Sequence, residues 1–259
     1  MAAEPIAVGV VGAGGRMGRT VCDAIAADPD LHLVAAVDPH VRGTEAPGGV
    51  AIERELTALT EAGAQVAVDF TIAPAARETL PWLAEHGIHA VVGTTGFDDH
   101  DLDTFRGAFT SSNCLIAPNF AIGAVVMMRF AELAAPFFET AEVIELHHDN
   151  KRDAPSGTAM ATVARLAAAS DRWAPDPTED EVVPGARGGA SDAGIRVHAV
   201  RLRGLVAHQE VLLGTTGQTL TIRHDSYDRS SFMPGVLVAI KRIGELPGLT
   251  VGLDGVLGL

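Results

Sequence analysis

Two adjacent histidines and a lysine lie within one short segment, residues 145–158, near the middle of the chain. The imidazoles of His147 and His148 can accept or donate a proton near neutral pH, and the ammonium group of Lys151 attracts anions. Adjacent residues of a regular strand face opposite sides of a sheet, so both histidines can serve one pocket only where the strand ends. The polar run 149–153 indicates that the strand does end there.

The elements around this segment would place the three side chains beside a helix start. Residues 141–146 are apolar with acidic interruptions, which is typical of a strand, and the Ala-rich run 158–169 predicts a helix. Pro155 suits the first turn of that helix and Ser156 suits its N-cap. The N–H groups and the positive end of the helix dipole favour a carboxylate or phosphate there. The segment therefore predicts a pocket for an acidic small molecule with a proton donor beside it.

Each of these residues also has an ordinary structural explanation. A histidine at a strand end is often a hydrogen-bonded polar residue without a chemical role. A single lysine such as Lys151 is often a solvated surface charge. The residue types alone leave both explanations open.

Composition and charge argue against several classes of protein. The chain has 259 residues, 47% of them hydrophobic, which allows one large domain or two ordinary ones. With 33 acidic and 19 basic residues the net charge is −14, which argues against nucleic acid or an anionic membrane as the partner. Cys22 and Cys114 show no metal-site spacing, and we expect no metal. Because no basic leader or membrane-length apolar run is present, we expect a cytoplasmic protein.

A glycine-rich turn near the N-terminus follows an apolar, β-branched run. Residues 6–11 predict a buried strand, 12–18 the turn, and 20–27 a helix. Strand, glycine turn and helix form the context of a dinucleotide-binding fingerprint, in which the backbone approaches a pyrophosphate closely. The spacing departs from the usual form, because residue 17 is Met and the glycines that set the pattern are Gly12, Gly15 and Gly18.

An acidic residue stands where such a fold binds the ribose of its cofactor. Residues 31–37 predict a second strand, and Asp38 follows it directly, about twenty residues past the glycine turn. A carboxylate there accepts a hydrogen bond from a 2′-hydroxyl and repels a 2′-phosphate, which favours NADH. Arg16, His40 and Arg42 favour the opposite choice, because each can pair with a phosphate.

Strands and helices alternate along the rest of the first half of the chain. We expect strands at 65–70, 88–92 and 114–117, helices at 53–61, 74–86 and 98–109, and a loop at 41–49. This alternation implies a parallel sheet with right-handed crossovers, which binds ligands at the carboxyl ends of its strands. Residues 93–95 and 117–120 stand at two of those ends, and together with the glycine turn they outline a cofactor cleft.

The second half of the chain has a different pattern. Residues 121–138 predict a core helix, with Val125, Met128, Phe130, Leu133 and Phe137 on its buried side. After the helix at 158–169, we expect a surface loop at 171–192, strands at 195–202, 209–214 and 218–224 with a hairpin turn at 215–217, and a helix at 232–242 that returns to the first region. These strands suggest an open α+β sheet whose uncovered face is an oligomer surface.

Several of these segments together resemble one enzyme family. The string ELHHDNKRDAPSGTA at 145–159 is similar to the signature of the dihydrodipicolinate reductase family, and so are VGAGGRMGR, VDFT, VVGTTGF, APNFAIGA and GLVAHQEV elsewhere in the chain. The resemblance implies an α/β fold: a Rossmann-type dinucleotide-binding domain, residues 1–118 completed by 230–259, and a central α+β domain, residues 119–229, for substrate binding and tetramerisation. It also implies a homotetramer and a small dicarboxylate substrate.

The resemblance assigns roles to individual residues. His147 matches the family's proton donor and Lys151 its second proton donor, in the NAD(P)H-dependent reduction of 4-hydroxy-tetrahydrodipicolinate for lysine and diaminopimelate synthesis. The residues that match substrate-carboxylate positions are His148, Gly157 and Thr158. The residues that match cofactor positions are Gly12, Ala13, Gly14, Gly15, Arg16, Met17, Asp38, Gly93, Thr94, Thr95, Ala117, Pro118, Asn119 and Phe120.

One position departs from the family's pattern. Members that favour NADPH tend to carry an arginine after the ribose-binding acid, and this chain has Pro39. We therefore expect NADH, with NADPH accepted through Arg16. Two other functions remain open: another Rossmann oxidoreductase acting on a different carbonyl compound, and a cofactor-binding tetramer without catalysis.

Overall fold

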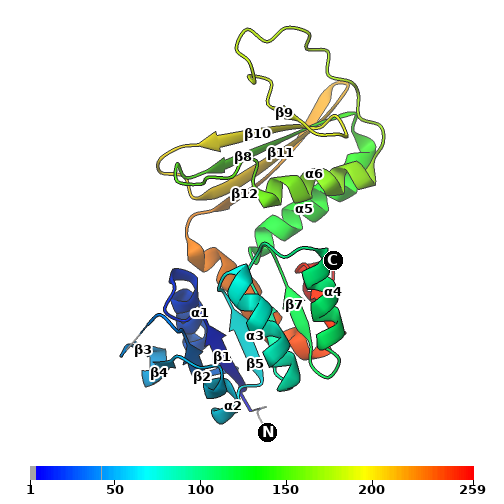
Figure 1. Cartoon of the computed structure of the whole chain (residues 1–259). Coiled ribbons are helices and arrows are strands. Elements are labelled where there is room, and N and C mark those ends of the chain that lie inside the picture. The colour runs from blue at the N-terminus through cyan, green and yellow to red at the C-terminus, as the bar shows by residue number, and fades with distance from the viewer. Residues whose placement is uncertain (1–3, 42) are drawn as a thin grey trace. The chain divides into compact units, whose positions relative to one another are not determined.

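The computed structural model describes residues 4–41 and 43–259, which form two compact units (Figure 1). The first unit consists of the described residues up to Phe120 together with Arg229–Leu259, and the second is Ala121–Asp228. These boundaries lie within two residues of the expected ones. No helix in the described part of the chain is long and apolar enough to cross a membrane.

The first unit is built on an eight-stranded sheet in the order β13-β7-β6-β5-β1-β2-β4-β3. Neighbouring strands are parallel, apart from the antiparallel pair β3 and β4. The strands are β1 (Ile6–Val11), β2 (Leu31–Val37), β3 (Glu45–Ala46), β4 (Val50–Glu53), β5 (Val66–Asp69), β6 (His89–Val92), β7 (Cys114–Ile116) and β13 (Leu249–Val251). The C-terminal strand β13 pairs with β7, so the tail of the chain completes this sheet.

Helices of the first unit pack on its sheet through fully buried apolar side chains. They are α1 (Arg16–Ala27), α2 (Thr57–Glu61), α3 (Ala73–Glu85), α4 (Asp99–Ala108), α7 (Met233–Arg242) and α8 (Asp254–Leu257), with short 3₁₀ turns at Pro47–Gly49, Arg229–Phe232 and Ile243–Glu245. Leu80 and Leu83 of α3 and Phe105 of α4 belong to one core cluster with strand residues. Burying one such side chain is worth roughly 1.5–3 kcal/mol. Helix α7 packs against α1, so the returning helix joins this unit as expected.

Three of the expected elements in this unit were wrong in their bounds. The expected loop at 41–49 contains β3, and the expected helix at 53–61 shrinks to α2, because Val50–Glu53 is the strand β4. Only Ile52 of that strand is buried, so it lacks a clear apolar alternation, and glycines and a proline precede it. Helix α1 begins at Arg16, earlier than expected, because Gly15 of the turn is already its N-cap.

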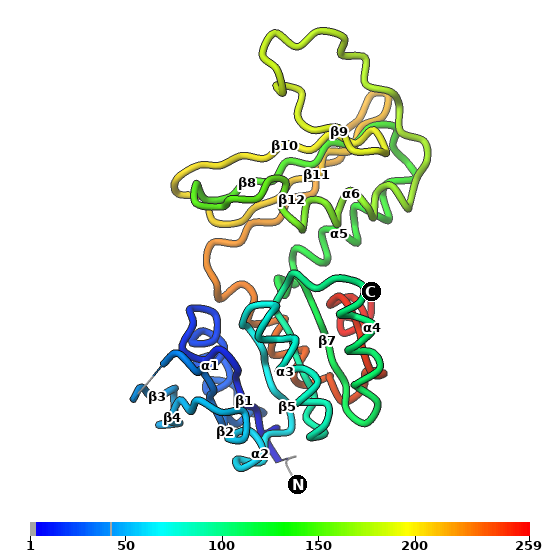
Figure 2. Tube along the Cα trace, in the orientation of Figure 1, coloured from blue at the N-terminus to red at the C-terminus, as the bar shows by residue number. Residues whose placement is uncertain are grey.

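The second unit is a five-stranded mixed sheet in the order β12-β11-β8-β10-β9. Strands β8 and β10 are parallel and the other neighbours are antiparallel. The strands are β8 (Thr140–His147), β9 (Gly189–Ala190), β10 (Arg196–Arg201), β11 (Ala207–Thr215) and β12 (Gln218–Ser226), and the helices are α5 (Ile122–Ala134), continued by a 3₁₀ turn at Ala135–Phe137, and α6 (Gly157–Ala169). Figure 2 shows the long loop between α6 and β9 extending beyond the sheet. The expected loop at 171–192 thus also holds the short strand β9.

Helices cover one of the two faces of this sheet. Helix α6 packs on β8 and α5 packs on β12, and both helices lie on the same face (Figure 1). Along β8, Ala141, Val143 and Glu145 are buried against this covered face. The alternate residues are only partly buried; they are Glu142, Ile144 and Leu146, and we call their side of the sheet the open face.

Two details of the helices differ from expectation. Val125 and Met128 of α5 are buried, but Phe130, Leu133 and Phe137 are exposed, the last by 77%, so the expected apolar side of this helix is only partly core. The apolar spacing drifts around the helix, and part of it faces away from the sheet. Pro155 lies before the N-cap of α6, not in its first turn.

Candidate active site

Strand β8 and helix α6 bring the histidine motif beside a helix start. Strand β8 ends at His147, and His148 begins an exposed loop, as the polar run predicted. Helix α6 begins at Gly157, with Ser156 as its N-cap. The Oγ of Ser156 accepts a 3.2 Å hydrogen bond from the N–H of Ala159, which confirms the expected cap.

A buried carboxylate on β8 joins these parts. The side chain of Glu145 is 0% exposed. Its Oε2 accepts from Nδ1 of His147 at 2.6 Å and from Nη1 of Arg201 at 2.7 Å. Its Oε1 accepts from Nη2 of Arg201 at 2.8 Å and from the backbone N–H of Ser156 at 2.9 Å. An ionised carboxylate only accepts hydrogen bonds, so Nδ1 of His147 carries a proton and Nε2 is the nitrogen that can exchange one.

Burial and charge act in opposite directions on the two titratable groups. Burial raises the pKa of Glu145, but the hydrogen bonds from Arg201 and His147 outweigh it and leave the pKa lowered, so this carboxylate is ionised. Burial lowers the pKa of His147; the Glu145 carboxylate raises it, Lys151 and Arg201 lower it further, and the net direction is down. His147 is therefore largely neutral in the free protein at neutral pH.

The loop after β8 carries the lysine of the motif. Nζ of Lys151 donates to both carboxylate oxygens of Asp153, at 2.9 and 2.7 Å. The N–H of Lys151 donates to the carbonyl of His148, and Nη2 of Arg201 donates to the carbonyl of Asp153 at 2.7 Å. The loop is thus held against the same arginine that binds Glu145, and the Lys151 charge lies near enough to act on the pKa of His147.

The start of α6 leaves room for an anion. A Cβ added at Gly157 would meet no heavy atom within 4 Å. Helix starts present backbone N–H groups and the positive end of the dipole. Gly157 and Thr158 occupy the first two positions of the helix, next to the cap that Glu145 binds. The structure therefore brings His147, Lys151 and this helix start into one region, whereas the side chain of His148 is exposed at its edge.

Sequence reasoning assigned no role to Glu145 or Arg201. Glu145 had a signal, since it stands two residues before His147 on a strand and so faces the same side. Arg201 had none, because it is 56 residues from Glu145 in the chain and reaches it only through the pairing of β10 with β8.

The glycine turn of the first unit has the geometry that a pyrophosphate requires. Gly12 has a φ of 80°, which other residues rarely adopt, and its N–H donates to the carbonyl of Val37. A Cβ at Gly18 would lie 2.1 Å from the Gly12 carbonyl oxygen, so helix α1 approaches the glycine turn too closely for any side chain at Gly18. Gly15 and Arg16 are exposed at the start of α1. These residues fit a dinucleotide cofactor.

Asp38 ties the end of β2 to the glycine turn. Its Oδ2 accepts a 3.0 Å hydrogen bond from the N–H of Gly14, and its Oδ1 accepts 2.9 Å from the N–H of His40. The carboxylate is 8% exposed and retains lone pairs for a ribose hydroxyl. His40 and Arg16 are exposed, and Arg42 lies outside the described residues.

A second buried acid, not assigned from sequence, holds the loops after β5 and β6. Oδ1 of Asp69 accepts from the N–H and Oγ1 of Thr71, at 3.0 and 2.7 Å, and from Oγ1 of Thr94 at 2.8 Å. Burial raises the pKa of Asp69. A Cβ at Gly93 would lie 2.0 Å from the Phe70 ring, so this ring covers the Gly93 backbone. Asp69 thus fixes Thr94 in the expected cofactor loop.

The loop after β7 lies beside that one. The N–H of Ala117 donates 3.0 Å to the carbonyl of Val92, and Phe120 is buried with its ring 5.8 Å from Phe70. Pro118 is exposed. A cavity of about 150 Å³ is lined by Thr94, Thr95, Gly96, Phe97, Leu102, Ile116, Pro118 and Val251. Residues that follow β6 and β7 therefore line one hollow. The remaining expected cofactor residues, Ala13, Met17 and Asn119, lie in the glycine turn, the first turn of α1 and this last loop.

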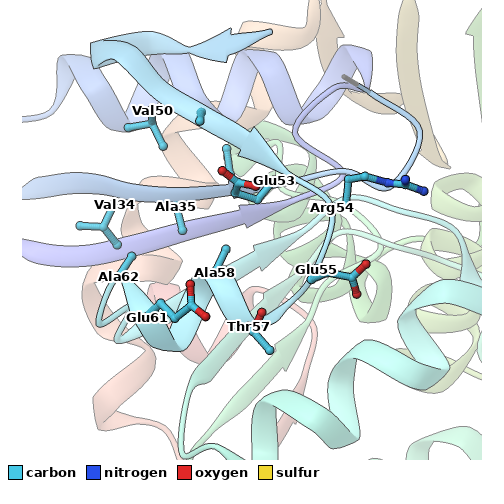
Figure 3. A pocket seen from close by; sticks show the side chains of 12 residues that line it. Val34, Ala35, Val50, Glu53, Arg54, Glu55, Thr57, Ala58, Glu61 and Ala62 are labelled. Carbon is cyan, nitrogen blue, oxygen red and sulfur yellow. The ribbon is translucent and has the colours of Figure 1, made fainter. Parts of the chain in front are cut away.

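None of the expected cofactor residues lines a larger groove, of about 690 Å³ (Figure 3). It runs along β2, β4 and α2 and is lined by Glu53, Glu55 and Glu61; among its described lining residues, Arg54 alone is basic. Three carboxylates repel a pyrophosphate, so this groove is a poor cofactor site. Among the residues that the structure describes, no group of three or more His, Cys, Asp or Glu side chains could hold a metal ion.

Comparison with known proteins gives a consistent result over the whole chain. Residues 6–120 match the family model "Dihydrodipicolinate reductase, N-terminus", and residues 123–257 match "Dihydrodipicolinate reductase, C-terminus". The 4-hydroxy-tetrahydrodipicolinate reductase of Nocardia farcinica is 57% identical, over 98% of this chain and 99% of that protein. The reductase of the same name from Cutibacterium acnes is 50% identical over the same shares.

Solved structures agree. The dipicolinate-bound dihydrodipicolinate reductase of Paenisporosarcina sp. TG-14 superposes with a TM-score of 0.88 at 38% identity, over 97% of this chain and 99% of that one. GenD2 of gentamicin A biosynthesis, solved in complex with NAD, has a TM-score of 0.64 at 14% identity, over 99% of this chain and 91% of that one, which shows a shared fold alone. The chain belongs to the dihydrodipicolinate reductase family, whose members are oxidoreductases that use a nicotinamide cofactor.

Proposed function

We propose that this chain reduces 4-hydroxy-tetrahydrodipicolinate to tetrahydrodipicolinate in lysine and diaminopimelate synthesis, with His147 as the proton donor. The name shared by its relatives supports the reaction. The observation that carries the residue assignment is the 2.6 Å hydrogen bond between Glu145 and Nδ1 of His147, beside the start of α6. It leaves Nε2 as the exchangeable nitrogen next to an anion-binding helix start.

The substrate carboxylates suit the region around α6. A dicarboxylate finds backbone N–H groups at Gly157 and Thr158, with His148 and Lys151 on the preceding loop. One contact between an anion and an exposed helix dipole is worth only about 0.3–1 kcal/mol, so the cationic side chains must contribute as well. The solved relative that binds dipicolinate, a flat dicarboxylate, supports this substrate class.

The proton step falls to His147. The reaction also releases the 4-hydroxyl of the substrate as water, which leaves a conjugated imine in the ring, and a bound nicotinamide would supply the hydride to that imine. Nε2 of His147 then donates a proton to the ring carbon of the resulting enamine, so the ring gains one hydride and one proton. Lys151 balances charge near the ring nitrogen. His147 must be protonated for this, and the two carboxylates of the bound substrate raise its pKa from the low value of the free protein.

The first unit is the proposed cofactor domain and the second the proposed substrate domain. The glycine turn fits the pyrophosphate, and the loops around Thr94 and Ala117 fit the nicotinamide end. NADH is the preferred cofactor, because Asp38 can accept from a ribose 2′-hydroxyl and Pro39 cannot pair with a 2′-phosphate. The ratio of kcat/KM for NADH and NADPH tests this choice; a preference for NADPH would contradict it.

The experiment that tests the function follows NADH oxidation with enzymatically generated 4-hydroxy-tetrahydrodipicolinate. His147→Gln and Lys151→Ala should each lower kcat by about 100- to 10,000-fold, the usual range for a lost general acid, while NADH still binds. His198→Gln is the matched control, because His198 also binds a glutamate on the same sheet, through Nε2 to Glu142 at 2.5 Å. Wild-type protein that binds NADH but never oxidises it with this substrate would contradict the proposal and leave the two other functions.

The same proposal includes a homotetramer in the cytoplasm. The open face of the second unit carries Ile144, Leu146, Val200 and Leu212, all of them partly exposed, which suits a contact between copies of the chain. Leu212→Glu should then lower the mass measured by light scattering. The free, buried thiols of Cys22 and Cys114 support a reducing compartment.

A further inference from the structure

The Glu145 carboxylate binds the proposed proton donor and the proposed anion site at the same time. One oxygen, Oε2, is bound to Nδ1 of His147, and the other, Oε1, is bound to the N–H of Ser156, the N-cap of α6. The two distances are 2.6 and 2.9 Å. A rigid carboxylate about 2 Å across thus fixes the distance from the imidazole to the first turn of α6.

Arg201 holds the carboxylate in place and charged. It donates to both oxygens of Glu145, at 2.7 and 2.8 Å, a bidentate geometry that fixes the plane of the carboxylate. Its Nη2 also donates to the carbonyl of Asp153, in the loop that carries Lys151. The side chain of Arg201 is only 19% exposed. The pair therefore links β8, β10, the loop and the helix start.

We propose that Glu145 is a positioning residue for the reaction: together with Arg201 it keeps His147 in the Nδ1–H tautomer, with Nε2 free for the substrate, and keeps the imidazole in register with the start of α6. The proposal rests on the proposed function of His147. It goes further, because a residue that does not touch the substrate sets both the protonation pattern of the donor and its distance from the substrate carboxylates.

The charges that act on His147 define a test. Glu145 on the same strand raises its pKa, and Lys151 in the loop and Arg201 on β10 lower it. Its neighbour on β11 is Ala207, which carries no charge. Replacing Glu145 by glutamine removes the carboxylate that favours the imidazolium and leaves the two cations, Lys151 and Arg201, that oppose it. The pH above which kcat/KM declines should therefore move downward.

Two variants separate charge from geometry. Glu145→Gln should lower kcat/KM for the substrate by about 100-fold or more, since loss of an orienting carboxylate in a serine protease costs about 10,000-fold. It should also weaken dipicolinate binding, shift the pH profile downward and leave the Kd of NADH unchanged. Glu145→Asp keeps the charge but is one carbon shorter, so it should lower kcat while the pH profile stays near that of the wild type.

The matched control is Glu142→Gln. Glu142 lies on the same strand and also binds a histidine and an arginine, His198 and Arg187, but on the open face. This variant should leave kcat/KM, the pH profile and dipicolinate binding as in the wild type. If the substitutions caused a general loss of structure, NADH binding would weaken as well, and Glu142→Gln would be affected as much as Glu145→Gln.

The unmodified protein gives a second measurement that does not depend on folding of a variant. With ¹⁵N-labelled histidine, NMR should show His147 protonated at Nδ1 and unprotonated at Nε2, the signal being assigned by its loss in His147→Gln. The opposite tautomer, or a Glu145→Gln variant with wild-type kcat/KM and pH profile, would overturn the proposal. If His147→Gln itself remains active, the proposed function fails instead, which separates the two.

Discussion

Strand β8 carries two clusters made of the same three residue types. In the His147 cluster, Glu145 binds His147 and Arg201 on the covered face. In the His198 cluster, Glu142 binds His198 and Arg187 on the open face, each at 2.5 Å. A composition-based search for a glutamate, a histidine and an arginine would rank the two equally.

Burial and connections separate them. Glu145 is 0% exposed and Glu142 is 28% exposed. The Glu145 carboxylate also accepts from the N–H of Ser156 and so reaches a helix start, whereas Arg187 connects its cluster to Asp176 of the long surface loop. Hydrogen bonds between the same residue types occur in both clusters, so they do not identify a functional site. What distinguishes the His147 cluster is that its carboxylate also holds a helix start in place.

The largest expected difference is in stability when the arginine is removed. Arg201→Met leaves the carboxylate of Glu145 buried without its counter-ion, which should lower the free energy of unfolding by about 3 kcal/mol, the lower end of the range for buried pairs. Arg187→Met should cost less than about 1 kcal/mol, because that pair is partly solvated. Urea unfolding of both variants, followed by circular dichroism, measures the difference. Equal losses would remove the distinction between the two clusters.

The next effect is on the pH dependence of catalysis. The pKa of His147 in the free protein lies below its ordinary value of 6.5, chiefly because of burial. If the imidazolium is the active form, kcat/KM falls as pH rises through that lowered pKa, by about tenfold per pH unit. The decline of kcat should begin at a higher pH than the decline of kcat/KM, because the bound dicarboxylate raises the pKa of His147 in the complex. His198→Gln should leave both pH profiles unchanged. A shift in the pH at which kcat or kcat/KM declines in this variant would contradict the assignment to His147.

The sequence predicted the parts of this comparison that are local in the chain. The end of β8 and the Ser156 cap followed from a polar run and a single residue type, because strand ends and helix starts depend on neighbours in sequence. The parallel sheet of the first unit followed from alternating apolar runs. Strand β4, which lies next to the edge strand β3, was missed, because Ile52 alone among its residues is buried and no alternation is visible.

The partners of the site could not be found in this way. Arg201 reaches Glu145 only through the pairing of β10 with β8, and Thr94 reaches Asp69 through the pairing of β5 with β6. Periodicity along the chain does not specify which strands pair. Phe130 of α5 and Phe137 of the 3₁₀ turn after it are exposed and show the converse limit. An apolar spacing does not say which part of a helix its neighbours cover.

The smallest expected effect is on stability as a function of pH. A histidine whose folded pKa lies below its unfolded pKa binds fewer protons in the folded state, so its contribution to stability is complete above pH 6.5 and is lost as pH falls through the folded pKa. Burial also lowers the pKa of His89 and His224, so the wild-type slope includes all three residues.

The difference between His147→Gln and the wild type isolates one of them. The unfolding free energy of the variant should fall less steeply below pH 6.5, by at most about 1.4 kcal/mol per pH unit. His198→Gln retains His147 and should keep that part of the slope. If the slope is unchanged in His147→Gln, burial does not oppose the imidazolium at this position. The substrate carboxylates would then not be needed to protonate His147. In that case kcat and kcat/KM should decline at the same pH.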